Sequence, residues 1–343
     1  MNTSGFIKTL LQKRFHFALA GVGGVFLFFL VVSSAQAIVL TPPRLELDGD
    51  PGSTISSEIK VTNEAAESRT YFTQVENFEA KDESGAPSFT QAREGLATWV
   101  SVASSVTLKA GEQKTIPFSI KLPRNAEPGG YFASIFIRTT PPPANGGEVS
   151  IGARLGSLLL VRVNGDIQEG VDILEFSSKD KQRFYSSLPV ELYYRFQNTG
   201  TDRVKPTGNV VIKNIFGMNA KLLGANRSEG SVLPRSIRRF DMAWLTSGGG
   251  TEDPMAQPSV SGEQGFFSAA KYQLGHFAFG MYTANLDITF GENNNTATGT
   301  FRFFVIPWQL LSISIVGLLL VFIVLKFSLK RYNRYIIKKH APR

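Results

Sequence analysis

The sequence offers few residues that could carry catalysis. Of its three histidines, only His276 lies between the two apolar ends of the chain, in the stretch "LGHFAFG". These apolar neighbours favour a structural histidine over a general base. Neither a Gly-x-Ser-x-Gly elbow nor a His-Glu-x-x-His zinc motif accompanies it. Because the chain has no cysteine, thiol catalysis and cysteine-bound metals are excluded as well.

Pairs of carboxylates are the other candidates for chemistry. Glu76 with Glu79 and Asp82 with Glu83 could in principle act as a glycosidase acid and base. Their context is instead typical of solvated charges on a loop. We therefore predict a protein that is not an enzyme, with no catalytic, cofactor-binding or metal-binding residues.

An aromatic strand is the best candidate for binding. In "YFASIFIR", alternation places Phe132, Phe136 and Arg138 on one face and the remaining apolar residues on the other. If the second face packs on a core, the first presents an aromatic row that could stack on a sugar or a protein. The alternative is a central strand covered on both faces by a second domain or a loop. Phe132, Phe136 and Arg138 are thus a possible ligand or partner surface.

Both ends of the chain read as membrane-directed segments. A basic start, the apolar run "FHFALAGVGGVFLFFLVV" and the small residues of "AQA" predict a signal peptide over 1–37. An uncleaved anchor is the alternative. Residues 307–325 contain no charge and approach the roughly 20 apolar residues that span a bilayer. Residues 326–343 carry seven basic and no acidic residues, which predicts a cytoplasmic tail and an extracellular N-terminal bulk.

This topology explains the basic composition. Of 36 Lys and Arg, three lie in the signal peptide and seven in the tail, which leaves 26 against all 28 acids, a net charge of −2 over 38–306. The excess of basic residues therefore serves membrane topology and gives no support to nucleic-acid binding. A cysteine-free extracellular segment of this size points to a bacterial envelope.

The segment between these ends is rich in short strand patterns separated by turns, as in β-sandwiches. In "KTIPFSIKL", apolar residues alternate with polar ones, and Pro117 places the strand at an edge or at a bulge because it cannot donate to a ladder. In "LPRNAEPGGYFASIFI", Gly129 and Gly130 predict a positive φ or a close backbone approach before the aromatic strand. We expect Gly130→Val to impair folding of residues 38–165.

A weak repeat divides the segment. "IKVTNEAAES" and "YYRFQNTGTD" each end a strand in Asn before a polar turn, and two further pairs of matching strings follow in the same order. The pattern predicts an all-β fold, with two tandem immunoglobulin-like β-sandwiches at 38–165 and 166–306, followed by one transmembrane α-helix. No other helix is predicted with comparable strength.

The order of these strings resembles the WxL-interacting protein family of bacterial envelope proteins. The strings are "ISSEIKVTNEAAESRTYFTQVENF", "SVTLKAGEQKTIPFSIKLPRNAEPGGYFASIFI" and "LYYRFQNTGTDRVKPTGNVVI", followed by a span and a basic tail. The resemblance implies a first immunoglobulin-like domain that binds peptidoglycan and a second that binds a partner. The loop of residues 247–265 and the direct join to the membrane depart from that pattern.

The sequence therefore predicts a membrane-anchored scaffold of the bacterial envelope. It would contact peptidoglycan or another cell-wall polymer and tether a partner surface protein, as a single-pass protein of the cell membrane. The alternative is an extracytoplasmic chaperone or assembly factor that acts by edge-strand pairing. This alternative is suggested by Pro117, which predicts a strand at the edge of a sheet.

Overall fold

Strands dominate the chain in a computed structural model that describes residues 38–91, 93–141, 153–245 and 265–340, with side chains up to residue 334. The predicted signal peptide lies outside the described residues, as does nearly all of the 247–265 loop. The strands of the N-terminal half are β1 (Ile38–Thr41), β2 (Arg44–Gly49), β3 (Thr54–Asn63), β4 (Arg69–Ala80), β5 (Pro87–Gln91), β6 (Val100–Val102), β7 (Ser105–Leu108), β8 (Gln113–Lys121), β9 (Gly129–Arg138) and β10 (Arg154–Val163). Those of the C-terminal half are β11 (Val171–Ser178), β12 (Phe184–Tyr185), β13 (Val190–Asn198), β14 (Thr207–Asn214), β15 (Asn219–Gly224), β16 (Ile237–Trp244), β17 (Gly280–Phe290) and β18 (Asn295–Val305).

The N-terminal half packs two sheets around one hydrophobic cluster. One sheet has the order β1-β3-β8-β6, and the other has the order β2-β10-β9-β4-β5 with β7 also paired to β4. The predicted alternation of β8 is confirmed, since Ile116, Phe118 and Ile120 are buried while Thr115 and Pro117 are exposed. Because each strand turns every second residue inward, the two sheets together enclose a core.

The C-terminal half has the same arrangement around a second cluster. Its sheets have the orders β11-β13-β16 and β12-β18-β17-β14-β15. Aromatic residues fill this core: Trp244, Tyr194, Phe196 and Phe303 are all almost fully buried. Aromatic side chains bury more apolar area than any others, which makes this cluster the main source of stability here.

The two halves share one strand arrangement, although the N-terminal half has two more described strands. The pairs β3–β8 and β13–β16 occupy equivalent places, as do β9 and β17, and these are the elements on which the three sequence repeats fall. In each half the second strand runs parallel to the last one: β2 pairs with β10, and β12 pairs with β18. An immunoglobulin-like β-sandwich architecture is confirmed, whereas division into two independent domains stays a prediction.

The repeated asparagine has a structural reason. Asn63 is fully buried at the end of β3, and its amide group donates to the carbonyl oxygens of Glu67, Leu108 and Lys109 at 2.8–3.2 Å. Asn198 at the end of β13 is equally buried and donates to two carbonyls in the same manner. Each asparagine therefore ties the turn after its strand to a neighbouring loop.

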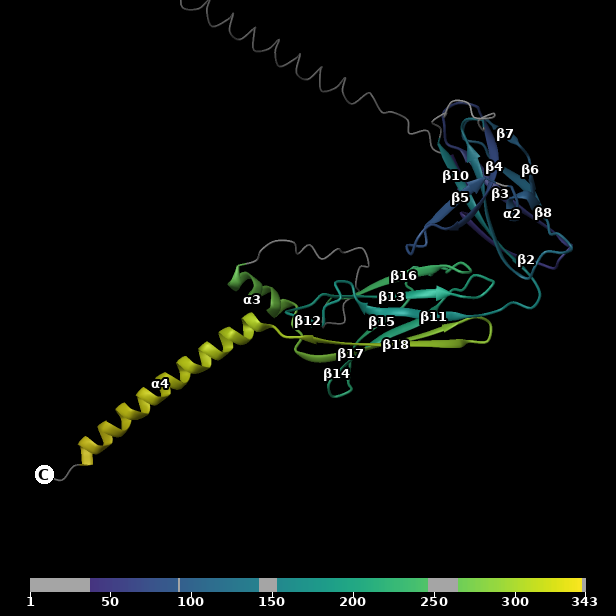
Figure 1. Ribbon diagram of the computed structural model, residues 1–343. Coiled ribbons are helices and arrows are strands. Elements are labelled where there is room, and N and C mark those ends of the chain that lie inside the picture. Colours follow the sequence, from purple (N-terminus) through teal and green to yellow (C-terminus); the bar gives the residue numbers. More distant parts are fainter. Residues whose placement is uncertain (1–37, 92, 142–152, 246–264, 341–343) are drawn as a thin grey trace, which may run out of the picture.

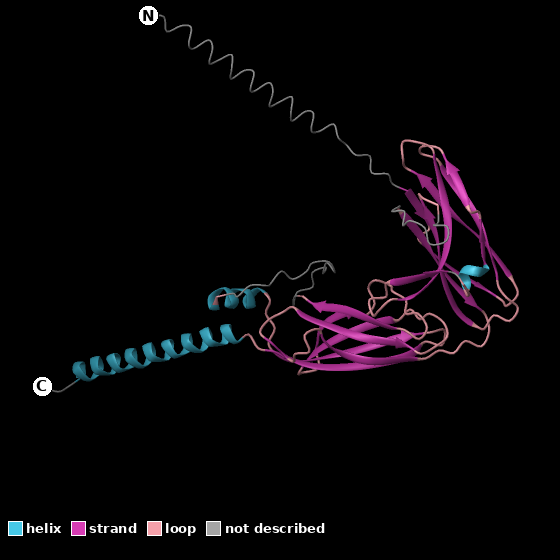
Figure 2. Cartoon of the chain, turned by 45° about the horizontal axis from the view of Figure 1, so that its top comes forward, coloured by secondary structure: helices cyan, strands magenta, loops and turns pink. Residues whose placement is uncertain are grey.

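Direct contacts join the two halves, whose long axes meet at an angle (Figures 1 and 2). In the β4–β5 turn, Glu83 accepts hydrogen bonds from the guanidinium group of Arg195 on β13 at 2.5–3.1 Å. The backbone oxygen of Glu83 also accepts the Arg239 N–H at 2.7 Å. The turn of one half is thus held at the outer edge of β16, and the Glu83 carboxylate reaches Arg195 on the outer face of the sheet.

The paired glycines at the start of β9 make a second contact between the halves. Gly129 has a φ of 144°, and a Cβ there would lie 2.6 Å from the Thr201 oxygen. The Gly130 N–H donates to that same oxygen at 2.9 Å, and a Cβ on Gly130 would lie 2.5 Å from Asp202 Oδ1. The predicted close approach is therefore present, and it serves the contact between halves as well as the turn.

Three helices are described, of which the sequence predicted only the last. They are α2 (Leu96–Trp99), α3 (Phe266–Gly275) and α4 (Trp308–His340). The segment Trp308–Arg334 of α4 is long and apolar enough to cross a membrane, with a mean hydropathy of 2.7 in its most apolar window and none of that window buried. Helix α4 begins one residue after the first residue of the predicted span of 307–325 and continues through the basic tail as far as His340.

Candidate partner-binding site

The structure places the predicted aromatic surface on the outer face of the sheet that contains β9. Phe136 is only 5% exposed, because the Phe89 ring packs edge-on against it at 4.8 Å and the Arg154 guanidinium lies over it at 4.3 Å. The expectation of an exposed aromatic row is therefore wrong for Phe136. The cover comes from β5 and β10 of the same sheet, not from the second half or a loop.

The other two predicted residues are half-buried and engaged. Phe132 packs against Phe78 with ring centroids 5.8 Å apart. Arg138 donates to the Gln74 side-chain oxygen at 2.5 Å, and Gln74 in turn donates to Glu76. Hydrogen-bonded side chains must give up these partners before they can bind a ligand. A ligand role for Phe132, Phe136 and Arg138 stays a prediction.

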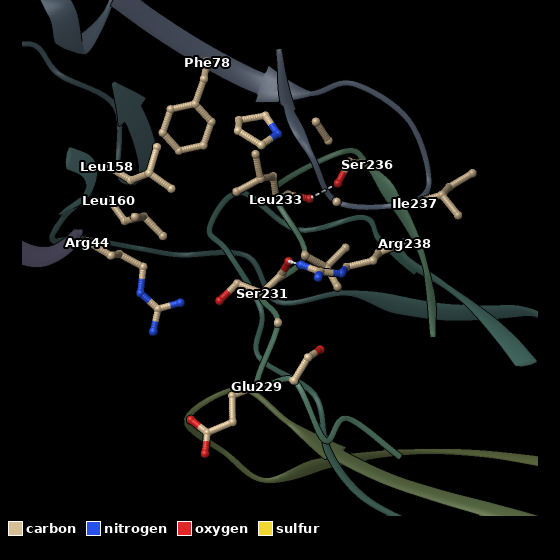
Figure 3. A pocket seen from close by; sticks show the side chains of 16 residues that line it. Arg44, Phe78, Leu158, Leu160, Glu229, Ser231, Leu233, Ser236, Ile237 and Arg238 are labelled. Atoms are coloured by element: carbon tan, nitrogen blue, oxygen red, sulfur yellow. Dashed lines mark hydrogen bonds between the residues drawn. The ribbon is translucent and has the colours of Figure 1, made fainter. Parts of the chain in front are cut away.

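A cavity of about 250 Å³ lies between the halves, where sequence reasoning had no means to find it. Figure 3 shows Phe78, Leu158 and Leu160 of the N-terminal half on one side and Leu233 of the C-terminal half facing them. Arg44, Glu229 and Arg238 also line the space, and Arg238 donates to the Ser231 oxygen at 2.8 Å. The cavity is thus mainly apolar with charged groups around it.

Beside this cavity, β10 has an open edge. The parallel pairing with β2 begins at Leu158, whose N–H donates to the Pro43 oxygen at 2.9 Å. Because successive backbone groups of a strand point to opposite sides, Arg154 and Gly156 direct their N–H and C=O groups to the same side as Leu158. No described strand continues β2 alongside these two residues. Among the described strands, none pairs with β10 at Arg154 and Gly156, although β1 lies close to β10.

The side chain of Leu155 belongs to the same stretch. Leu159, Val161 and Val163 of β10 point into the N-terminal core, and alternation puts Leu155 on that same side. Leu155, near the start of the strand, is 38% exposed. An added strand would meet an apolar side chain next to free backbone groups, the two features that strand addition uses.

The edge marked by Pro117 has the opposite character. Pairing of β8 with β6 covers only Phe118, Ser119 and Ile120, and no described strand flanks the outer side of β8 at Pro117. The predicted edge position is thus confirmed. The Leu122 N–H donates to the oxygen of Ser53, the residue before β3, at 2.9 Å. By alternation Pro117 therefore faces away from β3, where it has no N–H to offer. This edge is blunted, and Pro117 does not mark the pairing site.

Several of the residues considered for catalysis are engaged in other contacts, and Glu76 is buried on β4 rather than solvated on a loop. His276 caps α3, where its ring stacks on Tyr272 at 4.1 Å and its Nδ1 lies 3.1 Å from the Tyr272 oxygen. Glu76 pairs with Arg154 at 3.2 Å, and the hydrogen bond from Arg195 lowers the pKa of Glu83. Within the described ranges, no group of three or more His, Asp or Glu could hold a metal ion. The absence of enzymatic activity stays a prediction.

Comparison with known proteins finds similarity at the level of the fold. No protein-family model matches the chain, and no curated protein matches its sequence. Among solved structures, the class 5 fimbriae chaperone CfaA is 10% identical over 79% of this chain and 100% of its own, with a TM-score of 0.38.

The Pseudomonas aeruginosa CupB2 chaperone is 9% identical over 76% of this chain and 98% of its own, with a TM-score of 0.31. The E. coli chaperone DraB is 10% identical over 78% and 97%, with a TM-score of 0.33. Similarity at this level concerns chain architecture alone. Function is therefore argued below from this chain's own residues, and membership of the WxL-interacting protein family stays a prediction.

Proposed function

We propose that the protein is a membrane-tethered, extracytoplasmic binding protein that holds a partner protein by adding a strand of that partner to the open edge of β10. The single observation that carries the proposal is the pair of outward-facing backbone positions at Arg154 and Gly156, next to the exposed Leu155. Main-chain hydrogen bonds would supply affinity, and side-chain contacts beside them would supply specificity. In this account the protein acts as an assembly factor or chaperone.

The bare backbone of Gly156 supports this choice of edge. A Cβ there would lie 2.6 Å from Ser134 Oγ and 2.7 Å from the Phe136 ring, so the face above Gly156 is already filled by β9. A glycine at this position lets neighbouring side chains pack closely while its N–H and C=O remain directed outward. Side chains of β9 therefore pack against the outer face of β10 at Gly156, while the backbone groups of Gly156 point away from β9.

The membrane tether follows from α4 and the tail. The uncharged start of α4 would cross the bilayer, and the basic residues that follow would remain on the cytoplasmic side. The two immunoglobulin-like modules then stand outside the membrane. Figure 1 places the N-terminal half, which carries β10, at the far end of the molecule from α4. The pairing edge would thus lie far from the membrane that anchors it.

The scaffold predicted from the sequence shares the protein partner and the membrane anchor with this proposal. It differs in adding contact with peptidoglycan. No feature of the described residues favours a polymer site, since the aromatic face of β9 is largely covered. Peptidoglycan binding stays a prediction, and sedimentation of the full-length protein with isolated cell wall is its test.

Site-directed photocrosslinking in the native membrane tests strand addition. A photoreactive amino acid at position 155 is expected to crosslink to one segment of an envelope protein. Position 174 is the matched control, because Leu174 on β11 of the C-terminal half is 43% exposed, close to the value for Leu155. The expected result is a defined adduct at 155 and none at 174. Equal adducts at the two positions, or adducts scattered over many proteins, would exclude β10 as the binding edge.

A further inference from the structure

Exposed apolar side chains gather at one end of the C-terminal half. Phe216 is 81% exposed in the β14–β15 turn, and Phe267 is 79% exposed on α3. Large apolar side chains of this exposure are uncommon on a soluble surface when they occur together. We call the following set the apolar collar: Ile215, Phe216, Met218, Phe267, Leu274 and Phe279.

The strand register puts both parts of the collar at the same end of one sheet. Asn214, the last residue of β14, pairs with Tyr282 near the start of β17. Gly280, the first residue of β17, pairs with Val305, the last residue of β18. The β14–β15 turn and the segment before β17 therefore lie at the end of the sheet where the chain leaves for α4.

Helix α3 is fixed against the start of α4. The rings of Phe266 and Trp308 lie 5.8 Å apart, and the Leu310 N–H donates to Gln273 Oε1 at 3.2 Å. Figures 1 and 2 both show α3 beside the first turns of α4. While Gln273 is buried at this contact, Phe267 and Leu274 of the same helix stay exposed.

Almost no linker separates the sheet from the apolar helix. Strand β18 ends at Val305 and α4 begins at Trp308, with Ile306 held to the sheet through its N–H bond to the Tyr185 oxygen at 2.7 Å. A span that starts three residues after the last strand brings that end of the sheet to the membrane surface. The collar must then lie at the level of the lipid headgroups.

We propose that the apolar collar inserts into the interfacial layer of the bilayer that α4 crosses, so that the ectodomain rests on the membrane in a fixed orientation. This inference rests on the proposed membrane tether. The charge pattern fits lipid as the occupant: residues 213–221 and 266–280 contain three lysines and no acid. Aromatic side chains with nearby lysines are favoured at the headgroup boundary, where apolar rings and basic groups both find partners.

Depth measurement in lipid vesicles tests the inference on the full-length protein. The chain has no cysteine, so F216C and F267C each give one site for an environment-sensitive fluorophore. N293C is the matched control, because Asn293 is exposed in the β17–β18 turn at the opposite end of the same sheet. L320C reports on the tether itself, since Leu320 lies within the proposed span.

We expect the probes at 216 and 267 to lie within about 5–10 Å of the headgroup boundary. Their emission should shift to the blue, and shallow lipid-borne quenchers should quench them more than an aqueous quencher does. The probe at 293 should show the reverse. The vesicles contain phosphatidylcholine and phosphatidylglycerol and no other protein.

The outcomes separate the collar from the tether. Deep quenching at 320 with aqueous exposure at 216 and 267 would overturn the collar while the tether stands. Aqueous exposure at 320 would overturn both. Protection at 216 and 267 without lipid quenching would mean that a second copy of the chain covers the collar, which also overturns the proposal.

Discussion

Replacing Asn63 by alanine is expected to destabilise the N-terminal half strongly. The two N–H groups of the side-chain amide donate to three carbonyl oxygens, so that one N–H is shared by two of them. The amide oxygen accepts from the Ala65 N–H at 3.1 Å and the Tyr71 hydroxyl at 2.6 Å. A net hydrogen bond contributes about 0.5–1.5 kcal/mol, and a buried group left without a partner costs about 1–3 kcal/mol. Because Asn63 is fully buried, water cannot replace its contacts. We expect a loss of about 3–5 kcal/mol in the free energy of unfolding.

The assay is denaturant unfolding followed by tryptophan fluorescence. Trp99 reports on the N-terminal half through its contact with Tyr131 at 4.7 Å, and Trp244 reports on the C-terminal core. Variants that keep only Trp99 or only Trp244, with Trp308 also replaced, allow the halves to be followed separately. The Trp99 transition should move to lower denaturant in Asn63→Ala, since total stability is only about 5–15 kcal/mol for a domain.

Two control variants make the test specific. Asn198→Ala removes the equivalent contacts of the C-terminal half, so it should shift the Trp244 transition instead. Asn293→Ala, at an exposed turn, should change stability by less than about 0.5 kcal/mol. A loss below about 1 kcal/mol in Asn63→Ala would refute the assignment of this asparagine as a structural tie.

Two further predictions concern the contact between the halves. Gly130→Ala should weaken the contact between the halves by about 1–3 kcal/mol because its Cβ would overlap Asp202 Oδ1. Gly275→Ala, with open space around it, should leave that contact unchanged. The distance between spin labels on the two halves measures the effect, and equal distances in the two variants would contradict the prediction. The hydrogen bond from Arg195 lowers the pKa of Glu83. The ion pair therefore contributes its full stability above the ordinary pKa of glutamate and loses it as the pH falls through the lowered pKa. The distribution of distances between the two spin labels should broaden at acidic pH in the wild type but not in Glu83→Gln, and a pH-independent distribution in the wild type would contradict this prediction.

The sheet architecture was predictable because its signals are local. Alternation in β8 depends only on neighbouring residues, and burial of Ile116, Phe118 and Ile120 follows it directly. The repeated asparagines were also visible as strand-ending residues before a turn. Their hydrogen bonds to loops about 34–46 residues away were not, because the sequence does not state which carbonyls converge on a buried amide.

Long-range packing explains what sequence reasoning missed. Phe136 was taken as a candidate for an exposed row, and its cover comes from Phe89 of β5 and from Arg154 of the next strand, β10. The sequence does not show that these two side chains meet on the ring of Phe136. Helix α3 is only ten residues long and depends on its contact with α4, so its own pattern was too short to predict it. Pro117 was read correctly as an edge residue, but the open edge is on β10, where only pairing with β2 reveals it.

The central claim is that a partner strand pairs with the open edge of β10, and amide hydrogen exchange of residues 154–157 tests it most directly. In the free protein, the Leu155 and Ser157 amides should exchange slowly because they face β9, and the Arg154 and Gly156 amides should exchange fast. When the partner identified by crosslinking is added, exchange of the Arg154 and Gly156 amides should become slow, while exchange of the Leu155 and Ser157 amides should not change. A bound partner that leaves the Arg154 and Gly156 amides fast would contradict the account.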